Sequence, residues 1–460
     1  MIKDNLINKK TSGWLHVSDD DKNNIFNFCD EYIDFMNKSK TEREAVKTIV
    51  NMLNKKGFKN INDLEKLKPN DKIYYINRDK NVFASIIGND TIEKGINFIG
   101  AHLDSPRLDL KTNPLYEEAN MAYLKTHYYG GIKKYQWTTI PLSIHGVIVK
   151  PDGEKIEICI GEDDKDPIFT ITDLLPHLAN EQMQKKLNKA IEGEDLNLLI
   201  GNIPIDDKED SVKTNILNIL NKKYGVSEID FTSSEIELVP TFKAKSLGLD
   251  ESMVAAYGQD DKVCSYVSIK SLLNIDNPSK TCICILSDKE EIGSVGNTGM
   301  ESNALNYFIS EILNKLNINK PNLIDKIYMN SKMLSADVDA GYDPIYSSVS
   351  DKNNSSYISR GVVINKYTGS GGKYQASDAN AEYMAYIRKI LEDNNIKYQV
   401  SELGKIDIGG GGTIAYILAN KGIEVVDAGI SVLSMHAPYE VTSKFDIWSI
   451  YKFYTEFYKN

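Results

Sequence analysis

Two of the six histidines in this 460-residue chain lie in segments that could do chemistry. His102 begins the motif HLDSP, directly after a short apolar run, and His436 lies in MHAPYE, after another apolar stretch. Either histidine alone is weak evidence, because a single histidine is more often a structural residue than a ligand. Their surroundings therefore decide whether they form a site.

Three acidic clusters accompany these histidines, each at a predicted strand or helix boundary. They begin at Asp260, Asp288 and Asp337. Imidazole and carboxylate donors suit zinc, manganese or cobalt, and the absence of thiolate from the set favours a catalytic site over a structural one. If the clusters converge, two histidines and three carboxylates give five ligands. One bridging carboxylate would then let the set hold two ions that act on one water and one substrate.

The adjacent pair Glu290 and Glu291 points to a division of roles. Neighbouring side chains face different ways, so one can bind metal while the other takes a proton from water, as amide hydrolysis requires. The alternative is a solvated charge pair at the end of a strand.

The elements that must position these residues alternate between strand and helix. We expect strands at 96–100, 281–286, 327–337 and 423–429, because these are short apolar runs bounded by polar residues. Helical spacing predicts helices at 20–37, 41–56, 261–273, 302–316, 380–394 and 445–458. The pattern indicates an α/β fold whose mixed sheet is flanked by helices, with chemistry at the carboxyl ends of strands.

A different pattern occupies the middle of the chain. Short alternating stretches at 142–149 and 155–160 predict strands, and 176–189 and 210–223 have helical spacing. We therefore expect a smaller, β-rich mixed domain at 111–242, inserted between two parts of a catalytic domain, 1–110 and 243–460.

Composition excludes several classes of protein. The chain carries 54 basic and 65 acidic residues, a formal charge of −11, which argues against a nucleic-acid partner. No apolar run reaches the roughly 20 residues that span a bilayer, and the amino-terminal segment has no signal-peptide core. Five scattered cysteines are typical of a reducing compartment. We expect a cytoplasmic protein without a membrane partner.

Five segments together resemble the aspartyl aminopeptidase and aminopeptidase I group, which is metallopeptidase family 18 of the dinuclear zinc exopeptidase clan. They are 100–111 (GAHLDSPRLDLK), 260–262 (DDK), 288–294 (DKEEIGS), 335–337 (SAD) and 409–440, which begins GGGGT and ends MHAPYE. The resemblance covers most of the chain in the family's order.

The resemblance implies a role for each candidate at a two-metal site. His102 and Asp337 would hold one ion, Asp104 would orient His102, and Asp260 would bridge the two ions. The metals would be zinc, with cobalt or manganese as alternatives.

Three further roles follow from the same resemblance. Glu290 would be the general base, and Glu291 and His436 would bind the second ion. Which ion each terminal ligand serves is left open.

The resemblance also implies that copies of the chain act together. His177 would reach from the inserted dimerisation domain into a neighbouring active site and stabilise the oxyanion, with metal binding as its second possible role. Without the resemblance, His177 would be interpreted as a helix-start histidine. The implied assembly is a homo-oligomer built from dimers, such as a tetrahedral dodecamer.

Substrate contacts are expected at Lys366, Gly411 and Gly412. The glycine run fails as a phosphate loop because no lysine follows it, and small residues there would let a substrate backbone approach closely. Lys366 would favour an acidic amino-terminal residue through its charge, unless it is an ordinary surface lysine. Asp343 stands where the family usually has histidine, and if that turn helps to hold substrate, its charge argues against an acidic preference.

The sequence thus predicts a metal-dependent aminopeptidase that removes the amino-terminal residue from short peptides. A metal-dependent amidohydrolase or deacetylase of the same fold is the first alternative, because fold does not fix substrate. A scaffold without turnover is the second.

Overall fold

The computed structural model describes Leu6 and residues 10–460, and the chain divides into two compact units. The first unit comprises Met1–Asp104, Ala244–Met435 and Glu440–Asn460. The second comprises Ser105–Lys243 and the short segment His436–Tyr439.

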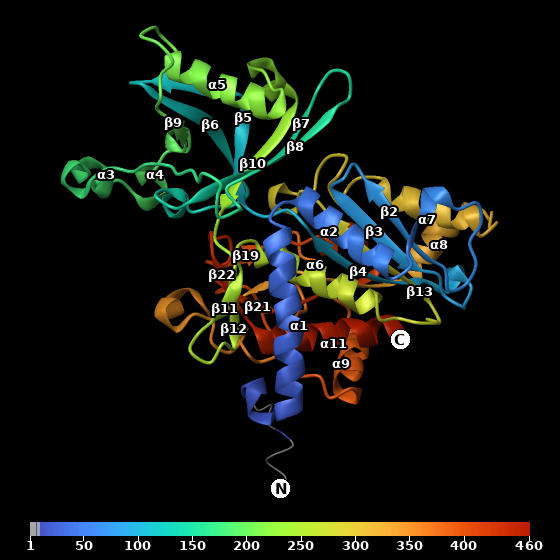
Figure 1. Cartoon of the computed structure of the whole chain (residues 1–460). Coiled ribbons are helices and arrows are strands. Elements are labelled where there is room, and N and C mark those ends of the chain that lie inside the picture. The colour runs from blue at the N-terminus through green and yellow to red at the C-terminus, as the bar shows by residue number, and fades with distance from the viewer. Residues whose placement is uncertain (1–5, 7–9) are drawn as a thin grey trace. The chain divides into compact units, whose positions relative to one another are not determined.

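The centre of the first unit is a nine-stranded mixed sheet (Figure 1). Its strands, in spatial order, are β1 Lys59–Asn60, β2 Lys72–Asn77, β3 Asn81–Ile86, β13 Thr281–Ser287, β4 Ile96–His102, β14 Lys332–Ser335, β20 Glu424–Gly429, β16 Val362–Asn365 and β18 Tyr398–Val400. Both faces are buried. In β13, Cys282, Cys284 and Leu286 enter one hydrophobic cluster, whereas Ile283 and Ile285 enter the other. The sheet is therefore a middle layer between two cores.

Helices cover both faces of this sheet. The first core contains residues of α1 Asp19–Lys38, α2 Glu42–Lys55, α6 Gln259–Leu272, α9 Ala381–Asp393 and α11 Lys444–Lys459. The second contains residues of α7 Ala304–Lys315, α8 Leu323–Met329 and α10 Ala415–Ala419. The α/β class and the flanking of a mixed sheet by helices are confirmed.

Local signals explain where the first helices begin. Ser18 accepts the N–H of Asp21 at the start of α1. Thr41 and Glu44 form a reciprocal capping box at the start of α2, which satisfies two backbone donors that the helix itself cannot pair. Both helices lie within a few residues of their predicted positions.

Three neighbouring parallel strands bring their carboxyl ends to one edge of the sheet. Ser287 of β13 pairs with His102 of β4, and Ser335 of β14 pairs with Gly100 of β4. The residues that directly follow these three strands are consequently neighbours at one edge of the sheet.

A second sheet of the first unit has five strands, and a two-stranded hairpin accompanies it. The sheet contains β11 Lys245–Leu247, β12 Met253–Ala256, β22 Glu440–Ser443, β21 Ser431–Leu433 and β15 Asp339–Ala340, and the hairpin contains β17 Gly369–Ser370 and β19 Gly410–Gly411. Because β12 runs directly into α6, this sheet sets the position of the residues at the start of α6.

The second unit is built on a six-stranded antiparallel sheet with one long helix (Figure 1). Its strands are β8 Lys155–Ile160, β7 Leu142–Val149, β10 Ser234–Pro240, β5 Arg107–Glu118, β6 Met121–Tyr129 and β9 Leu198–Gly201, and the helix is α5 Ser211–Tyr224.

Two predicted elements were wrong in part. The expected strand at 327–337 begins as the end of α8 and becomes β14 only at Lys332, because Leu323 and Ile327 lie one helical turn apart and are buried together. The expected helix at 176–189 is broken into three short pieces: η5 Pro176–Leu178, α3 Asn180–Gln184 and α4 Leu187–Ala190. No helix of the described chain combines the length and the apolar character that a bilayer span requires.

Candidate metal centre

His102 is the last residue of β4 and is 2% exposed. The hydroxyl of Ser265 in α6 donates to its backbone oxygen at 2.6 Å. The next residue, Leu103, donates its N–H to the backbone oxygen of Ser287 at 2.8 Å. The end of β4 is therefore held from both sides, which fixes the backbone position from which the imidazole of His102 extends.

The hydrogen bonds of the His102 ring select its tautomer. Nδ1 lies 3.0 Å from the backbone oxygen of Asp104 and 3.4 Å from its Oδ1. Both atoms are acceptors when the carboxyl is ionised, so Nδ1 carries the proton. Nε2 then presents a lone pair, as a metal ligand must.

Nε2 of His102 faces three carboxylates. It lies 3.3 Å from Oδ1 of Asp260, 3.9 Å from Oε2 of Glu290 and 4.0 Å from Oδ1 of Asp337. Ligand atoms of His102, Asp260 and Asp337 all lie within 4.8 Å of one another. The structure thus brings together three of the predicted ligands with the predicted base beside them.

Asp104 holds the two neighbouring glutamates in place. Its Oδ1 accepts the N–H of Glu290 at 3.1 Å, and its Oδ2 accepts the N–H of Glu291 at 3.2 Å. The glutamates begin η8 Glu290–Ile292, which Lys289 enters with a left-handed φ of 69°. Asp104 is completely buried. One carboxylate therefore fixes the backbone of both glutamates and also contacts the ring of His102.

Asp260 lies at the start of α6, and a residue without a predicted role supports it. Its N–H donates to Oε2 of Glu440 at 3.0 Å, and Nε2 of Gln259 donates to the backbone oxygen of Glu440 at 2.7 Å. The peptide bond between Asp260 and Asp261 is cis. Glu440 ends the motif MHAPYE, and its place in that motif was the only signal the sequence offered.

Asp337 follows β14 and is positioned by a close backbone approach. The N–H of Ala336 donates to the backbone oxygen of Gly100 at 2.7 Å, which extends the pairing of β14 with β4. A Cβ added at Gly429 would lie 1.7 Å from the backbone oxygen of Asp337. Only glycine fits at that place in β20.

The site concentrates negative charge in a buried place. Burial raises the pKa of Asp337 well above its usual value, and the charges of Asp261 and Asp260 raise it further. Burial lowers the pKa of His102, but hydrogen bonds to Asp104 and Asp260 and the charge of Glu290 outweigh that effect and raise it. Without a cation these carboxylates therefore favour a second proton on Nε2, which a bound metal would displace. Buried carboxylates this close to one another either take up protons or have a cation among them, and a bound cation would let them stay ionised. The donor set of one imidazole nitrogen and several carboxylate oxygens fits zinc.

His436 belongs to the second unit, in the segment His436–Tyr439. Its Nδ1 lies 2.9 Å from the backbone oxygen of Gly131, so this ring too carries its proton on Nδ1 and presents Nε2. A Cβ at Gly131 would lie 3.2 Å from that Nδ1, closer than an ordinary contact. Gly131 is a second supporting residue that the sequence did not reveal.

The remaining candidates lie on exposed segments. His177 is exposed in η5 of the second unit. Lys366 follows β16, and its Nζ lies 3.6 Å from Oδ1 of Asp378. Gly411 ends β19 and Gly412 follows it. A Cβ at Gly412 would meet no atom within 4 Å, so open space lies beside this residue.

Comparisons with known proteins agree with a zinc site. Residues 35–458 match the family model described as aminopeptidase I zinc metalloprotease (M18). A protein of Clostridium acetobutylicum named a probable M18 family aminopeptidase 1 is 49% identical over 465 residues, covering all of both chains. A Thermotoga maritima protein of the same name is 45% identical over 96% of this chain and 97% of its own.

Solved structures give the same result. The crystal structure of the M18 aminopeptidase from Thermotoga maritima has a TM-score of 0.95 at 43% identity, covering 98% of this chain and all of that chain. Aminopeptidase I from Clostridium acetobutylicum has a TM-score of 0.93 at 46% identity, covering 99% and 100%.

The fold is therefore that of the zinc exopeptidases. The chain belongs to the M18 family of aminopeptidases and is a zinc aminopeptidase, a hydrolase of peptide bonds.

Proposed function

We propose that this aminopeptidase uses two zinc ions and Glu290 as general base to release the amino-terminal residue of short peptides. The observation that carries the proposal is the ring of His102. Its Nδ1 proton is directed to the backbone oxygen of Asp104, and its Nε2 faces Asp260, Glu290 and Asp337 at 3.3 to 4.0 Å.

His102 and Asp337 would hold one ion and Asp260 would bridge to the second, which Glu291 and His436 would hold. The tautomers of both histidines support metal binding by each ring, because each directs Nδ1 to a backbone oxygen and leaves Nε2 for a metal. When bound, the two ions supply Lewis acidity at the scissile carbonyl and at the attacking water.

Glu290 would take a proton from the attacking water as its oxygen bonds to the carbonyl carbon. The same carboxyl would then give that proton to the leaving nitrogen as the carbon–nitrogen bond breaks. Asp104 supports this role because it fixes the backbone N–H groups of Glu290 and Glu291. A general base needs such fixed placement beside the reacting water.

His177 would act in the active site of a partner subunit, where its imidazole would stabilise the developing oxyanion. Its exposure on η5 agrees with a role outside its own unit. We propose that the second unit carries dimerisation and that dimers build a larger homo-oligomer. One structural relative of this fold, at 23% identity and a TM-score of 0.76, is described as the mApe1 dodecamer of Saccharomyces cerevisiae.

Specificity would be for an acidic or a neutral amino-terminal residue. Lys366 is partly exposed, and its ion pair with Asp378 is long enough, at 3.6 Å, to be exchanged for a substrate carboxylate. Asp343 accepts the N–H of Ile345 at 2.9 Å and so caps η9 Pro344–Val349, which keeps its charge engaged with backbone.

The test is release of free amino acids from peptides that differ only in an acidic, neutral or basic amino-terminal residue. The full chain is assayed after chelator treatment and after return of zinc, cobalt or manganese, with bound metal counted per subunit. We expect the chelator to abolish amino-acid release and returned metal to restore it, with two bound ions per subunit in the active protein. Full activity at one ion per subunit would contradict the two-metal mechanism.

A further inference from the structure

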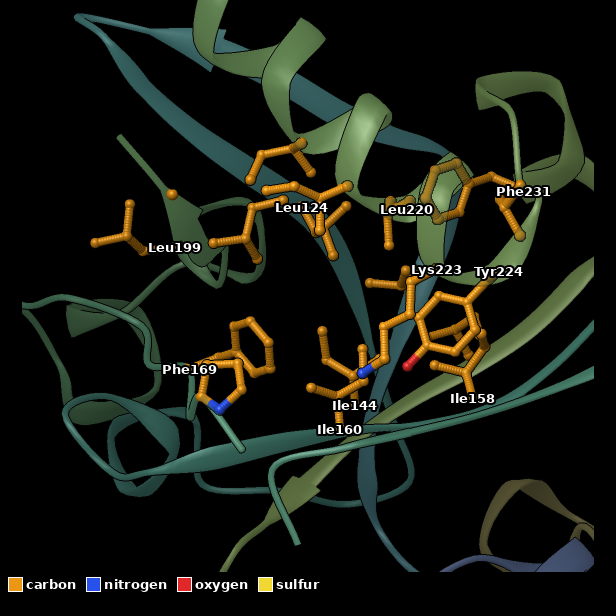
Figure 2. Close-up of a pocket in the computed structure, with 18 of the residues that line it drawn as sticks. Leu124, Ile144, Ile158, Ile160, Phe169, Leu199, Leu220, Lys223, Tyr224 and Phe231 are labelled. Carbon is orange, nitrogen blue, oxygen red and sulfur yellow. The ribbon is translucent and has the colours of Figure 1, made fainter. Parts of the chain in front are cut away.

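The second unit contains a cavity of about 570 Å³ between its six-stranded sheet and α5 (Figure 2). Its lining is almost wholly apolar, and the residues labelled in Figure 2 include Leu124, Ile144, Ile158, Ile160, Phe169, Leu199, Leu220 and Phe231. Small-molecule sites typically have volumes of roughly 300–1,000 Å³. The cavity lies within one unit and involves none of the candidate metal ligands.

The cavity exists because the helix covers only part of the sheet. α5 packs against β5, β6 and β9. The apolar lining continues onto β7 with Ile144 and Ile148 and onto β8 with Ile158 and Ile160. Both large buried hydrophobic clusters of the described residues lie in the first unit. A largely apolar space of this size that opens to solvent is typical of a ligand site.

Strand register makes the floor of the cavity apolar. Ile144 pairs with Ile160 across β7 and β8, and Ile158 lies two residues before Ile160 on the same face. Near the edge, Ile168 and Ile219 line the space but remain 60% and 52% exposed. An occupant with a long apolar body would cover surface that the protein leaves in water.

One charged side chain belongs to the lining. Lys223 lies on the face of α5 that carries Ile216, Ile219 and Leu220, at the spacing where the apolar stripe would continue. In Figure 2 its side chain extends from α5 toward the sheet, with its amine beside the hydroxyl of Tyr224. A positively charged side chain thus occupies a position on the apolar stripe of α5, at the edge of an apolar cavity.

The neighbours of Lys223 leave its charge available. Its Nζ lies 5.0 Å from the ring centroid of Tyr224, and a hydrogen bond to that side chain raises the pKa of Lys223. The nearby carboxylate of Asp166 is engaged by the N–H groups of Gly161 at 3.0 Å and Asp163 at 3.4 Å. The ammonium can therefore meet an anionic group at the mouth of the cavity.

We propose that this cavity binds a single-chain amphiphile of the fatty-acid class, with its alkyl chain against the isoleucine floor and its carboxylate at Lys223. Charge complementarity selects this occupant, because an uncharged apolar molecule would gain nothing from a lysine on the stripe. This cavity contains none of the residues proposed for peptide hydrolysis. A negative result for amphiphile binding would therefore leave the proposed metal mechanism unaffected.

The test is calorimetric titration of the full-length, zinc-loaded protein with laurate and, separately, with dodecyltrimethylammonium. The two probes share an alkyl chain and carry opposite charges. We expect saturable binding of laurate below its micellar concentration and weaker binding of the cation. Absence of saturable laurate binding, or equal binding of the two probes, would overturn the proposal.

Two lysine variants distinguish a specific role of the Lys223 charge from a general effect of removing one positive charge from α5. Lys223→Met keeps the apolar body of the side chain and should weaken laurate about threefold to fivefold, as expected for a partly exposed ion pair. Lys222→Met is the matched control, since Lys222 is the preceding exposed residue and does not line the cavity. Equal effects of the two substitutions would overturn the role of Lys223.

A cavity-filling variant tests the location. Leu199→Phe adds volume at a half-buried wall position and should weaken laurate by about tenfold or more, with unchanged Tm and peptidase turnover as checks on folding. Unchanged laurate affinity would place binding elsewhere. A changed particle mass in this variant would instead make the cavity an interface between copies of the chain, which also overturns the proposal.

Discussion

The backbone N–H of Asp260 donates a hydrogen bond to Oε2 of Glu440, and the two atoms lie 3.0 Å apart. Glu440 is 1% exposed, and its backbone oxygen also accepts from the side chain of Gln259. The glutamate therefore holds the turn that places Oδ1 of Asp260 beside Nε2 of His102.

Replacing Glu440 should weaken metal binding without unfolding the protein. Glu440→Ala leaves the N–H of Asp260 buried without its acceptor, and loss of such supporting bonds costs about tenfold to a hundredfold in metal affinity. Glu440→Gln keeps an acceptor oxygen and is the matched control. Both variants are stripped of metal with a chelator and titrated with zinc, and their peptidase turnover is then measured. Equal zinc affinity in Glu440→Ala and wild type would contradict this role.

Glu290→Gln should keep its zinc and lose turnover. The amide cannot take a proton from water, and general-base catalysis contributes about a hundredfold or more to rate. Metal analysis and peptide hydrolysis are measured on the same sample, with Glu392→Gln on the exposed face of α9 as control. Near-normal turnover in Glu290→Gln would reject this residue as the base.

Much of the site could be expected from local sequence. Short apolar runs before His102 and Asp288 predict buried strands, and parallel strands that end together bring their following residues to one edge. The structure does bring the side chains of His102, Asp260 and Asp337 within ligand distance of one another. The roles of these residues and the domain boundaries stay predictions.

The supporting residues could not be predicted in this way. Glu440 accepts from Asp260 across 180 positions of sequence, and Gly131 accepts from His436 across 305. Neither contact has a periodic signature, because each depends on how separate elements pack. The strand expected at 327–337 failed for a related reason: a short apolar run does not distinguish a buried helix from a strand.

The buried carboxyl of Asp446 should make stability fall as pH rises. Burial raises its pKa to about 8, although N–H groups of Gly361 and Ser359 oppose this shift. The unfolded value is about 3.9, so between about pH 4 and pH 8 the folded state binds the proton more tightly. The stabilisation that the protonated Asp446 contributes is then fully present below about pH 4 and is lost as the pH rises to about 8. Asp446→Asn should lessen the drop in Tm between about pH 6 and pH 8.

Asp63→Asn, an exposed change in η2 Ile61–Asp63, is the control for this measurement. Both proteins are melted in excess zinc, so that metal loading does not vary with pH. A Tm drop in Asp446→Asn as large as in wild type would show that this carboxyl is not the source of the dependence.

Lys366→Ala should lower kcat/KM for peptides with an acidic first residue more than for those with a neutral one. The expected loss is about fivefold, the usual limit for an exposed ion pair. Lys373→Ala is the matched control, because Lys373 pairs with the same carboxylate of Asp378, at 2.9 Å. A parallel change in both variants would show that Asp378, rather than substrate, explains the effect.

Two inactive variants should restore activity to each other if His177 acts across subunits. We expect His177→Ala to lose about a hundredfold in kcat with zinc retained, as for other lost oxyanion donors, whereas His127→Ala, an exposed histidine of the same unit, should not. In a dimer that pairs His177→Ala with Glu290→Gln, one active site receives both native residues. About half of randomly paired dimers are mixed, so an equal mixture should recover about a quarter of the wild-type rate. No recovery in mixed dimers, verified by two affinity tags, would show that His177 does not act in the partner's site.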